Sequence, residues 1–402
     1  MAENFDFIDS KEFKSFLSEN AGTDPSKLRL KEFRHLDFDK NLAITQIECR
    51  AKARKKIPEL AEQLAYPTDV SIEQCSSETL ARFHASLFKK CDSAVDLTCG
   101  LGIDTYYISQ EVDMMTSIDA SETVASAAKR NMAALGRTNV EIINSTAEEY
   151  VDATSGKDVS AFFVDPSRRL TADRTQRTYA IRETIPDLNF IIPRIEKRCD
   201  FIVVKASPMV DLTQTLNDFK RITDVWVLSV RNECKEVLFK IDFNSLADET
   251  TKIHCTDFTL HGTVEFTIEQ RAEIADGQPA VGDCLLIPNA SIMKAGAYDA
   301  LGAQLGLTRI AANSHLHLAA NAVEGYPGRQ FKIKEVLSLS KADIKKLKGI
   351  TVKANIACRN FPMKPEELKK KLKIEDGGNY YIFATTLADK SRCLLLCEPV
   401  NA

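Results

Sequence analysis

The stretch from Ala94 to Tyr107 limits what this chain can fold into more than any other part of it. A short apolar run ends in an acid, two glycines flank one residue, and a helix-forming segment follows; this is the pattern of a strand, a tight turn and a helix N-terminus. Gly100 and Gly102 let the main chain approach a ligand with its amides directed at it. A dinucleotide-binding turn would need a third glycine where this chain has Thr105. The turn therefore favours S-adenosylmethionine (SAM), which has no pyrophosphate, over NAD.

Polar residues also close the next three apolar runs. Asp119 ends the second run, Ser145 and Thr146 follow the third, and Asp165 ends the fourth. Open α/β sheets bind ligands at the carboxyl ends of their strands, so we expect these side chains around one pocket. The alternatives are ordinary helix N-caps and an ordinary strand-to-helix turn. The residues expected to bind the cofactor are Ser76, Ser77, Asp96, Thr98, Gly100, Gly102, Asp104, Asp119, Ala120, Thr146, Ala147 and Glu148.

The composition is that of a cytoplasmic globular protein. Its 402 residues are 44% hydrophobic, enough for two or three domains with buried cores. The N-terminal residues carry acids and lack the pattern of a secretory signal, and no run approaches the roughly eighteen apolar residues that span a bilayer. The 11 cysteines form no CxxC pair and have no histidine couple at zinc spacing, so we expect reduced thiols and no metal site.

Charge is distributed unevenly along the chain. The formal net charge is only -4, yet residues 329–374 hold fourteen basic and four acidic side chains, an excess of +10. Such an asymmetry indicates that this end of the chain binds a polyanion. Lys369, Lys370 and Lys371 lie on a predicted helix, and with Arg359 and Arg169 they are the residues expected to contact RNA.

The hydrophobic pattern of the first 245 residues predicts two regions. Residues 1–90 read as helical, with one helix expected over 42–65. Residues 91–245 alternate strands with helices, which is typical of a parallel, doubly wound sheet. The last two strands, 225–230 and 236–243, are expected to pair as an antiparallel hairpin. A hairpin that closes an otherwise parallel sheet gives the Rossmann-like, seven-stranded α/β architecture of class I methyltransferases.

Two smaller regions are expected after this sheet. Residues 246–328 have a weaker pattern, with short strands and one helix near 291–305, and read as a linking α+β domain. Residues 329–402 read as a compact βαβαββ unit that carries the basic excess.

Several motifs resemble one known family over nearly the whole chain. They resemble bacterial class I SAM-dependent methyltransferases that carry a ferredoxin-like insert and a C-terminal THUMP-like domain. The core is also similar to trimethylguanosine synthase, both in Ser76-Ser77-Glu78 before the first strand and in the glycine loop. The family motifs are Asp96-Leu-Thr-Cys-Gly-Leu-Gly-Ile-Asp104, Asp165-Pro-Ser-Arg-Arg169, Glu233-Cys-Lys-Glu236, Pro288-Asn-Ala-Ser-Ile-Met-Lys-Ala-Gly296, Asn360-Phe-Pro362 and Asp376-Gly-Gly378.

The resemblance implies roles for the acids at the strand ends. Asp96 would meet the methionine amino group of SAM, Asp119 the ribose hydroxyls, and the turn from Thr146 to Glu148 the adenine edge. The segment that contains Ser76 and Ser77 is either a helix cap or a lid over the methionine of SAM.

Asp165, Pro166, Ser167 and Arg168 are the expected catalytic residues. Amino-methyltransferases use an (Asp/Asn)-Pro-Pro-aromatic motif, whose acceptors bind the target NH2 group and whose ring stacks on its base. Here Ser167 and Arg168 stand in place of the second proline and the aromatic residue, although an arginine plane also stacks on a base. Arg168 and Arg169 are alternatively a phosphate clamp.

These observations predict a SAM-dependent methyltransferase that modifies a guanine or adenine amino group in RNA. One alternative is a methyltransferase for a small molecule or a protein, in which the basic tail serves as an oligomer surface. Another is an RNA-binding protein that has kept the fold but lost the reaction.

Overall fold

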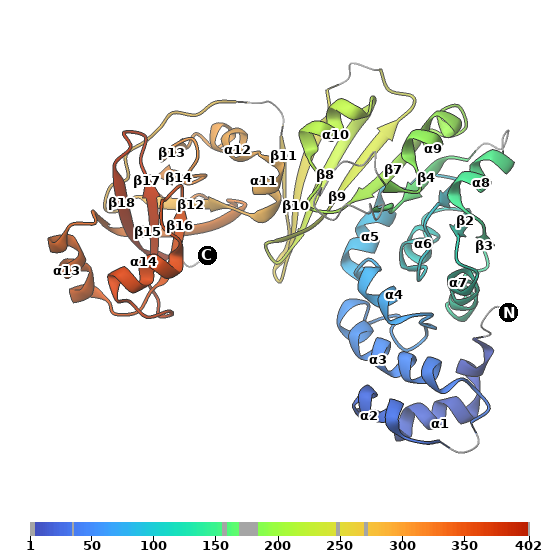
Figure 1. The fold of residues 1–402 in the computed structure, drawn as a ribbon. Helices are drawn as coiled ribbons and strands as arrows, with labels where there is room; N and C mark the ends of the chain where they lie inside the picture. The colour runs from blue at the N-terminus through green and yellow to red at the C-terminus, as the bar shows by residue number, and fades with distance from the viewer. Residues whose placement is uncertain are drawn as a thin grey trace. The chain divides into compact units, whose positions relative to one another are not determined.

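The computed structural model describes residues 5–33, 36–154, 159–168, 184–246, 250–268 and 272–400 (Figure 1). The chain divides into two compact units. The first consists of residues 1–224 and 237–251, and the second of residues 225–236 and 252–402. The four domains expected from the sequence, 1–90, 91–245, 246–328 and 329–402, divide the chain more finely and stay predictions.

Short helices build the N-terminal part of the first unit. Buried phenylalanine rings hold them together; the Phe13 ring packs edge-on against Phe7 and Phe38. The helix expected over 42–65 ends at Lys56, because Pro58 disfavours helical geometry at Ile57, the C-cap residue with φ −140°. The elements are η1 (Asp6–Asp9), α1 (Lys11–Glu19), α2 (Pro25–Leu30), α3 (Lys40–Lys56), α4 (Asp69–Gln74) and α5 (Glu78–Ser86).

The predicted doubly wound sheet lies mostly in the first unit; residues 225–236, in the hairpin that closes it, belong to the second. Its strand order is β3-β2-β1-β4-β7-β9-β8, with β3 to β7 parallel and β9 antiparallel to β7 (Figure 1). This is the seven-stranded class I methyltransferase order, so the predicted fold class is confirmed. The strands are β1 (Ser93–Asp96), β2 (Met114–Asp119), β3 (Val140–Asn144), β4 (Ala161–Val164), β7 (Phe201–Ala206), β8 (Ile222–Val230) and β9 (Glu233–Asp242).

Helices connect these strands, and a short ribbon follows β4. The helices are α6 (Ile103–Ile108), α7 (Glu122–Ala134), α8 (Ala147–Ala153), α9 (Leu188–Ile195) and α10 (Leu212–Asp218). The ribbon pairs β5 (Ser167–Arg168) with β6 (Thr184–Ile185). All four residues of β4 are buried, as expected for a strand covered on both faces. The chain moves outward from β1 in both directions, so β1 and β4 flank the switch point where such sheets bind ligands.

The hairpin that closes the sheet turns more tightly than its sequence suggested. We expected a connection over 231–235, but only Arg231 and Asn232 lie between β8 and β9. Both have positive φ, 51° and 63°, as a two-residue type I′ turn requires. Beyond β8 the strand order continues with β10 (Lys252–Thr259) and β11 (Gly262–Ile268).

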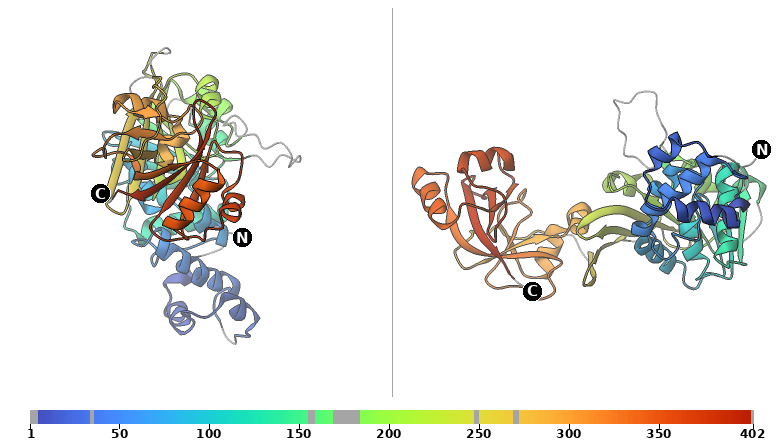
Figure 2. Two further views of the ribbon diagram at one scale, coloured as in Figure 1. Left: turned by 90° about the vertical axis from the view of Figure 1, so that its left-hand side faces the viewer. Right: turned by 90° about the horizontal axis from the view of Figure 1, so that it is seen from below.

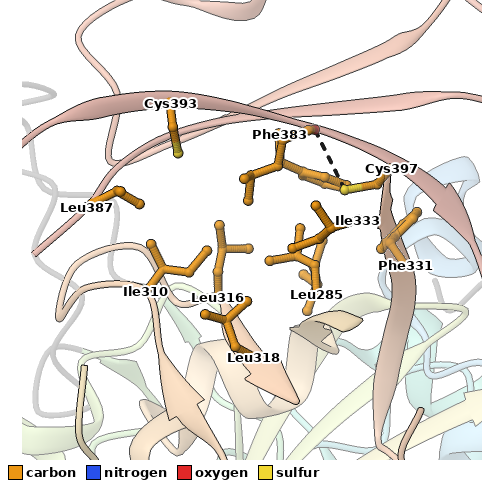
Figure 3. Packing of buried hydrophobic residues seen from close by; sticks show 12 residues of the cluster. Leu285, Ile310, Leu316, Leu318, Phe331, Ile333, Phe383, Leu387, Cys393 and Cys397 are labelled. Atoms are coloured by element: carbon orange, nitrogen blue, oxygen red, sulfur yellow. Dashed lines mark hydrogen bonds between the residues drawn. The ribbon is translucent and has the colours of Figure 1, made fainter. Parts of the chain in front are cut away.

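The second unit contains a further, seven-stranded sheet with the order β13-β14-β12-β15-β18-β17-β16. Its strands are β12 (Cys284–Pro288), β13 (Thr308–Arg309), β14 (His317–Ala319), β15 (Gly328–Leu337), β16 (Asn355–Arg359), β17 (Tyr381–Thr386) and β18 (Arg392–Pro399). Side chains that alternate along the strands form two cores. Leu285, Phe331 and Phe383 belong to one of them (Figure 3). The other lies beneath two helices that sit on the same side of the sheet (Figures 1 and 2).

Those two helices are α13 (Lys341–Ile350) and α14 (Pro365–Leu372). The single helix expected near 291–305 is in fact two, α11 (Ala290–Ala295) and α12 (Tyr298–Gln304). Gly296 separates them in a left-handed conformation, φ 65°. Among the residues described, no helix is long and apolar enough to cross a bilayer.

Candidate active site

The turn after β1 has the geometry that its glycines predicted. Gly100 and Gly102 have φ of 52° and 83°, which other residues adopt only at a cost. The Gly100 amide donates to Asp119 Oδ2 at 2.9 Å, which ties the turn to the end of β2. A Cβ on Gly102 would lie 2.9 Å from Met132 Cε, whereas one on Gly100 would meet no atom within 4 Å. Gly102 thus packs against α7, and Gly100 faces open space.

A cavity of about 430 Å³ opens at the carboxyl ends of β1, β2 and β4. Segments far apart in the sequence meet there, as the strand-end pattern predicted. The preceding segment contributes as well, because Thr68, Ser71 and Cys75 line the cavity. Ten of the expected site residues line it, namely Thr98, Gly100, Asp104, Asp119, Ala120, Thr146, Ala147, Glu148, Asp165 and Ser167.

The other expected residues lie elsewhere. Ser76 is buried, and Ser77 is the N-cap of α5. Asp96, Gly102 and Pro166 adjoin residues that line the cavity without lining it themselves. The side chain of Arg168 and all of Arg169 lie outside the described residues.

Asp96 lies in the interior. It is fully buried, and its Oδ1 accepts hydrogen bonds from the Thr98 amide at 2.9 Å and the Thr98 hydroxyl at 3.3 Å. Its Oδ2 accepts from Thr105 Oγ1 at 2.7 Å. Burial raises the pKa of the Asp96 carboxyl to about 7, although these hydrogen bonds oppose the shift. Through these hydrogen bonds, the buried Asp96 carboxyl stabilises the glycine turn from the interior of the protein.

Asp119 presents a carboxylate to the cavity. Oδ2 accepts from the Gly100 amide, and Oδ1 accepts from the Ser121 amide at 2.9 Å. Burial raises the pKa of this carboxyl, while the two amides oppose the shift. Each oxygen keeps a lone pair for a further donor, which suits two vicinal hydroxyls.

The start of α8 forms another wall of the cavity. Thr146 caps this helix in a capping box with Glu149, which fixes the turn. Glu148 Oε1 accepts from the Asp187 amide at 2.8 Å and so ties α8 to the start of α9.

A buried polar network that the sequence did not suggest lies beside these residues. Lys205 Nζ, at the end of β7, donates to Asp165 Oδ2 at 2.6 Å and to Ser76 Oγ at 2.9 Å. Ser76 Oγ donates to Asp104 Oδ2 at 2.7 Å, and His84 Nδ1 lies 2.7 Å from Asp104 Oδ1. One sequence signal was available, since Lys205 is a charge near the end of the otherwise apolar β7.

The network sets the charge of Asp104. Burial alone would raise the pKa of this carboxyl, but His84 and Lys205 favour the ionised form and lower the pKa to about 2. The cavity has four carboxylates in its lining, Asp104, Asp119, Glu148 and Asp165, and the Lys205 ammonium lies next to Asp165. Among the residues described, no group of three or more His, Cys, Asp or Glu side chains could hold a metal ion.

Comparison with known proteins identifies the C-terminal region first. Residues 328–399 match the THUMP domain-like family, and residues 285–327 match a ferredoxin-like domain family. No curated protein matches the chain.

A solved structure matches the whole chain. It is described as a putative methyltransferase from Porphyromonas gingivalis W83, with 28% sequence identity, a TM-score of 0.89 and coverage of 100% of both chains. This chain is a class I methyltransferase with ferredoxin-like and THUMP-like domains. Two other structures match less of it. An rRNA methylase from Streptococcus thermophilus is 15% identical, with a TM-score of 0.30, over 41% of this chain and 94% of its own. TrmK from M. capricolum with S-adenosylhomocysteine is 12% identical, with a TM-score of 0.33, over 42% of this chain and 70% of its own.

The cavity of this methyltransferase fits SAM. Gly100 leaves space where any side chain would intrude, and Asp119 offers two acceptors at the position that ribose hydroxyls need. The neighbouring carboxylates favour a cationic ligand, and SAM carries both a sulfonium and an amino group.

Proposed function

We propose that this SAM-dependent methyltransferase methylates a base amino group in RNA, either tRNA or rRNA. One observation carries the proposal: Asp165, ion-paired with Lys205, lines the same cavity as Gly100 and Asp119. A hydrogen-bond acceptor for the target amine thus lies beside the residues that fit the methyl donor.

Asp165 and Lys205 have different roles in positioning the acceptor amine. SAM supplies an activated methyl group when bound, so the chain mainly has to align the acceptor. Alignment is worth at most about 7 to 11 kcal/mol. Asp165 accepts a hydrogen bond from the amino group and directs the nitrogen lone pair at the methyl carbon. Lys205, 2.6 Å away and itself buried, donates to the Asp165 carboxylate and fixes its position.

The RNA part of the proposal rests on charge. The excess of +10 over residues 329–374 falls within the THUMP-like match. Lys369, Lys370 and Lys371 follow one another in the last turn of α14, and Lys369 is ion-paired with Asp376. Lys370 and Lys371 would then hold RNA phosphates, together with Arg359 on β16.

The departure from the amino-methyltransferase motif favours a second candidate. Ser167 follows Pro166 where an aromatic-bearing motif would have a second proline, and Arg168 follows where it would have the aromatic residue. A small molecule or a protein amine needs no stacking platform, so either could replace the RNA base as acceptor.

Two substitutions test the assignment of Asp165. Asp165→Ala removes the hydrogen-bond acceptor for the amine and should lower RNA methylation about a hundredfold or more, the effect of a misplaced reacting group. Lys205→Met removes the ammonium that positions the Asp165 carboxylate and should lower methylation in the same direction. The measurements are methyl incorporation into RNA, with calorimetric SAM affinity as the second readout.

Lys197→Met is the matched control, because Lys197 is an exposed lysine after α9. SAM affinity should stay within about twofold in all three variants. Unchanged turnover in Asp165→Ala would remove Asp165 from the mechanism. Unchanged turnover in Lys205→Met would reduce the ion pair to a structural contact.

A further inference from the structure

We propose a second ligand site, an arginine-lined pocket in the second unit that holds one nucleotide of the RNA substrate. This proposal rests on the proposed function and states where the protein holds the RNA. The pocket has a volume of about 700 Å³ and lies entirely within the second unit. Its walls come from the turn between β8 and β9, the β10–β11 hairpin, the start of α11 and strands β15, β16 and β17. The lysines of α14 are not part of its lining.

Three arginines make the pocket cationic. Arg231 lies in the turn after β8, Arg329 on β15 and Arg359 on β16. Among the residues described, no carboxylate forms an ion pair with any of them. Asp257 also lines the pocket, but it is buried and accepts hydrogen bonds from the Asn232 amide and Ser229 Oγ, both at 3.0 Å. Three guanidinium groups without a carboxylate partner favour an anionic ligand.

The turn that carries Arg231 and the side chain of Arg329 are held in place before any ligand arrives. The Arg231 amide donates to the Phe258 carbonyl at 2.8 Å, and Asn232 Oδ1 accepts from the Ala290 amide at 2.8 Å. The turn is thereby fixed to β10 and to the start of α11. The Arg329 guanidinium packs over the rings of Phe331 and Tyr381, at 4.8 and 5.0 Å from their centroids. A site with fixed side chains loses little entropy when it binds.

The remaining lining is apolar and suits a base. Val264, Ile287, Met293 and Phe383 all contribute to it. A free phosphate would leave this surface unused, and an acidic peptide would place charges against it. A nucleotide satisfies both parts, with its phosphate on the arginines and its base against the apolar wall.

The test uses the full chain and a fluorescein-labelled single-stranded RNA of mixed sequence. Fluorescence anisotropy is measured from about 50 to about 200 mM salt, where phosphate contacts weaken steeply. The triple variant Arg231→Gln, Arg329→Gln, Arg359→Gln should bind at least about tenfold more weakly. The slope of log affinity against log salt should flatten by about 0.7, because one phosphate contact on a single strand contributes about that much.

The matched control removes the same charge elsewhere in the unit, with Lys341→Gln, Lys345→Gln and Lys348→Gln on α13. Emission from Trp226, the single tryptophan, stacked on His254 in this unit, reports whether each variant is folded. Because Arg329 packs on two rings, the double variant Arg231→Gln, Arg359→Gln is measured as well. It should also bind more weakly than the wild type and flatten the slope, by less than the triple variant.

The outcomes separate this proposal from the proposed function. Salt-dependent wild-type binding that drops selectively in the pocket variants supports the pocket. Salt-dependent wild-type binding that falls equally in the pocket and α13 variants overturns the pocket and leaves RNA as the substrate. Wild-type binding that is absent or insensitive to salt overturns the RNA proposal, and the pocket with it.

Discussion

At the scale of single residues, Lys205 at the end of the buried strand β7 must be paired to offset the cost of its burial. Lys205 is 8% exposed, and removing an ammonium from water costs several kcal/mol unless it is paired. Asp165 and Ser76 supply its partners, 40 and 129 residues away in the chain. Because Asp165 borders the cavity, the pair links the buried core to the place where we expect the chemistry.

Asp96 gives a prediction for stability against pH. The carboxyl has a pKa of about 7 in the folded protein, compared with its ordinary 3.8. Between these values the folded state binds more protons than the unfolded state, so the free energy of unfolding falls as pH rises from about 4 to about 7. The loss is about 1.4 kcal/mol for each pKa unit. Asp96→Asn should remove this dependence and stabilise the protein at higher pH.

Urea unfolding of the wild type and of Asp96→Asn at about pH 5 and about pH 8 measures the effect. Asp104 does not interfere, because its lowered pKa removes stability only as pH falls from about 4 towards 2. Equal pH dependence in the two proteins would show that Asp96 does not carry a raised pKa.

Single residues were predictable from the sequence where local geometry determines their role. Gly100, Asp119 and Asp165 belong to strand-end and turn patterns, and all three line the cavity. Lys205 and His84 were missed, because their importance comes from partners at distant positions in the chain. Asp96 shows another limit: the sequence marks an acid at the end of β1 but not that the acid is turned into the interior.

At the scale of elements, the two glycines of the turn between β1 and α6 are expected to differ in their effect on SAM binding. Gly100 and Gly102 both have positive φ, so alanine at either should cost about 1 to 2 kcal/mol. Gly102→Ala should cost little beyond this, because the atom that its Cβ would meet, Met132 Cε, is the far end of a flexible side chain. Gly100→Ala should instead weaken SAM binding, because its methyl group enters open space at a residue of the cavity lining.

Gly136→Ala is the control for both glycines. Gly136 has φ 68°, meets no atom within 4 Å and lies after α7, outside the cavity lining. It should reproduce the φ cost alone and leave SAM affinity unchanged. Chemical denaturation and SAM calorimetry on the three variants provide the measurements. Similar SAM affinity in Gly100→Ala and Gly136→Ala would place the cofactor elsewhere.

Helices and strands with a strong hydrophobic periodicity were predictable from the sequence. The positions at which they break were harder to predict. The strands expected over 225–230 and 236–243 are β8 (Ile222–Val230) and β9 (Glu233–Asp242), whose ends lie within three residues of the expected bounds. The helix expected over 291–305 breaks at Gly296, where periodicity alone did not reveal a left-handed residue. The pairing of β12 with β15 joins the ferredoxin-like and THUMP-like matches in one sheet, and strand pairing of this kind is a tertiary choice that no local pattern specifies.

At the scale of the whole molecule, the cavity proposed for methyl transfer and the basic surface proposed for RNA binding belong to different units. The cavity lies in the first unit, and the arginine pocket and the basic excess lie in the second. A substrate that uses both must be a large polyanion, since a small molecule would leave one of them unused. Covalent linkage of the units raises the effective concentration of one site for RNA that is already held by the other.

The most direct measurement of the central claim compares modified nucleosides in total RNA from cells with and without this gene. The expected result is one base methylated on an exocyclic nitrogen that disappears without the gene. It should return with the wild-type chain but not with Asp165→Ala. An unchanged set of methylated nucleosides, from a chain that binds SAM, would contradict RNA as the acceptor.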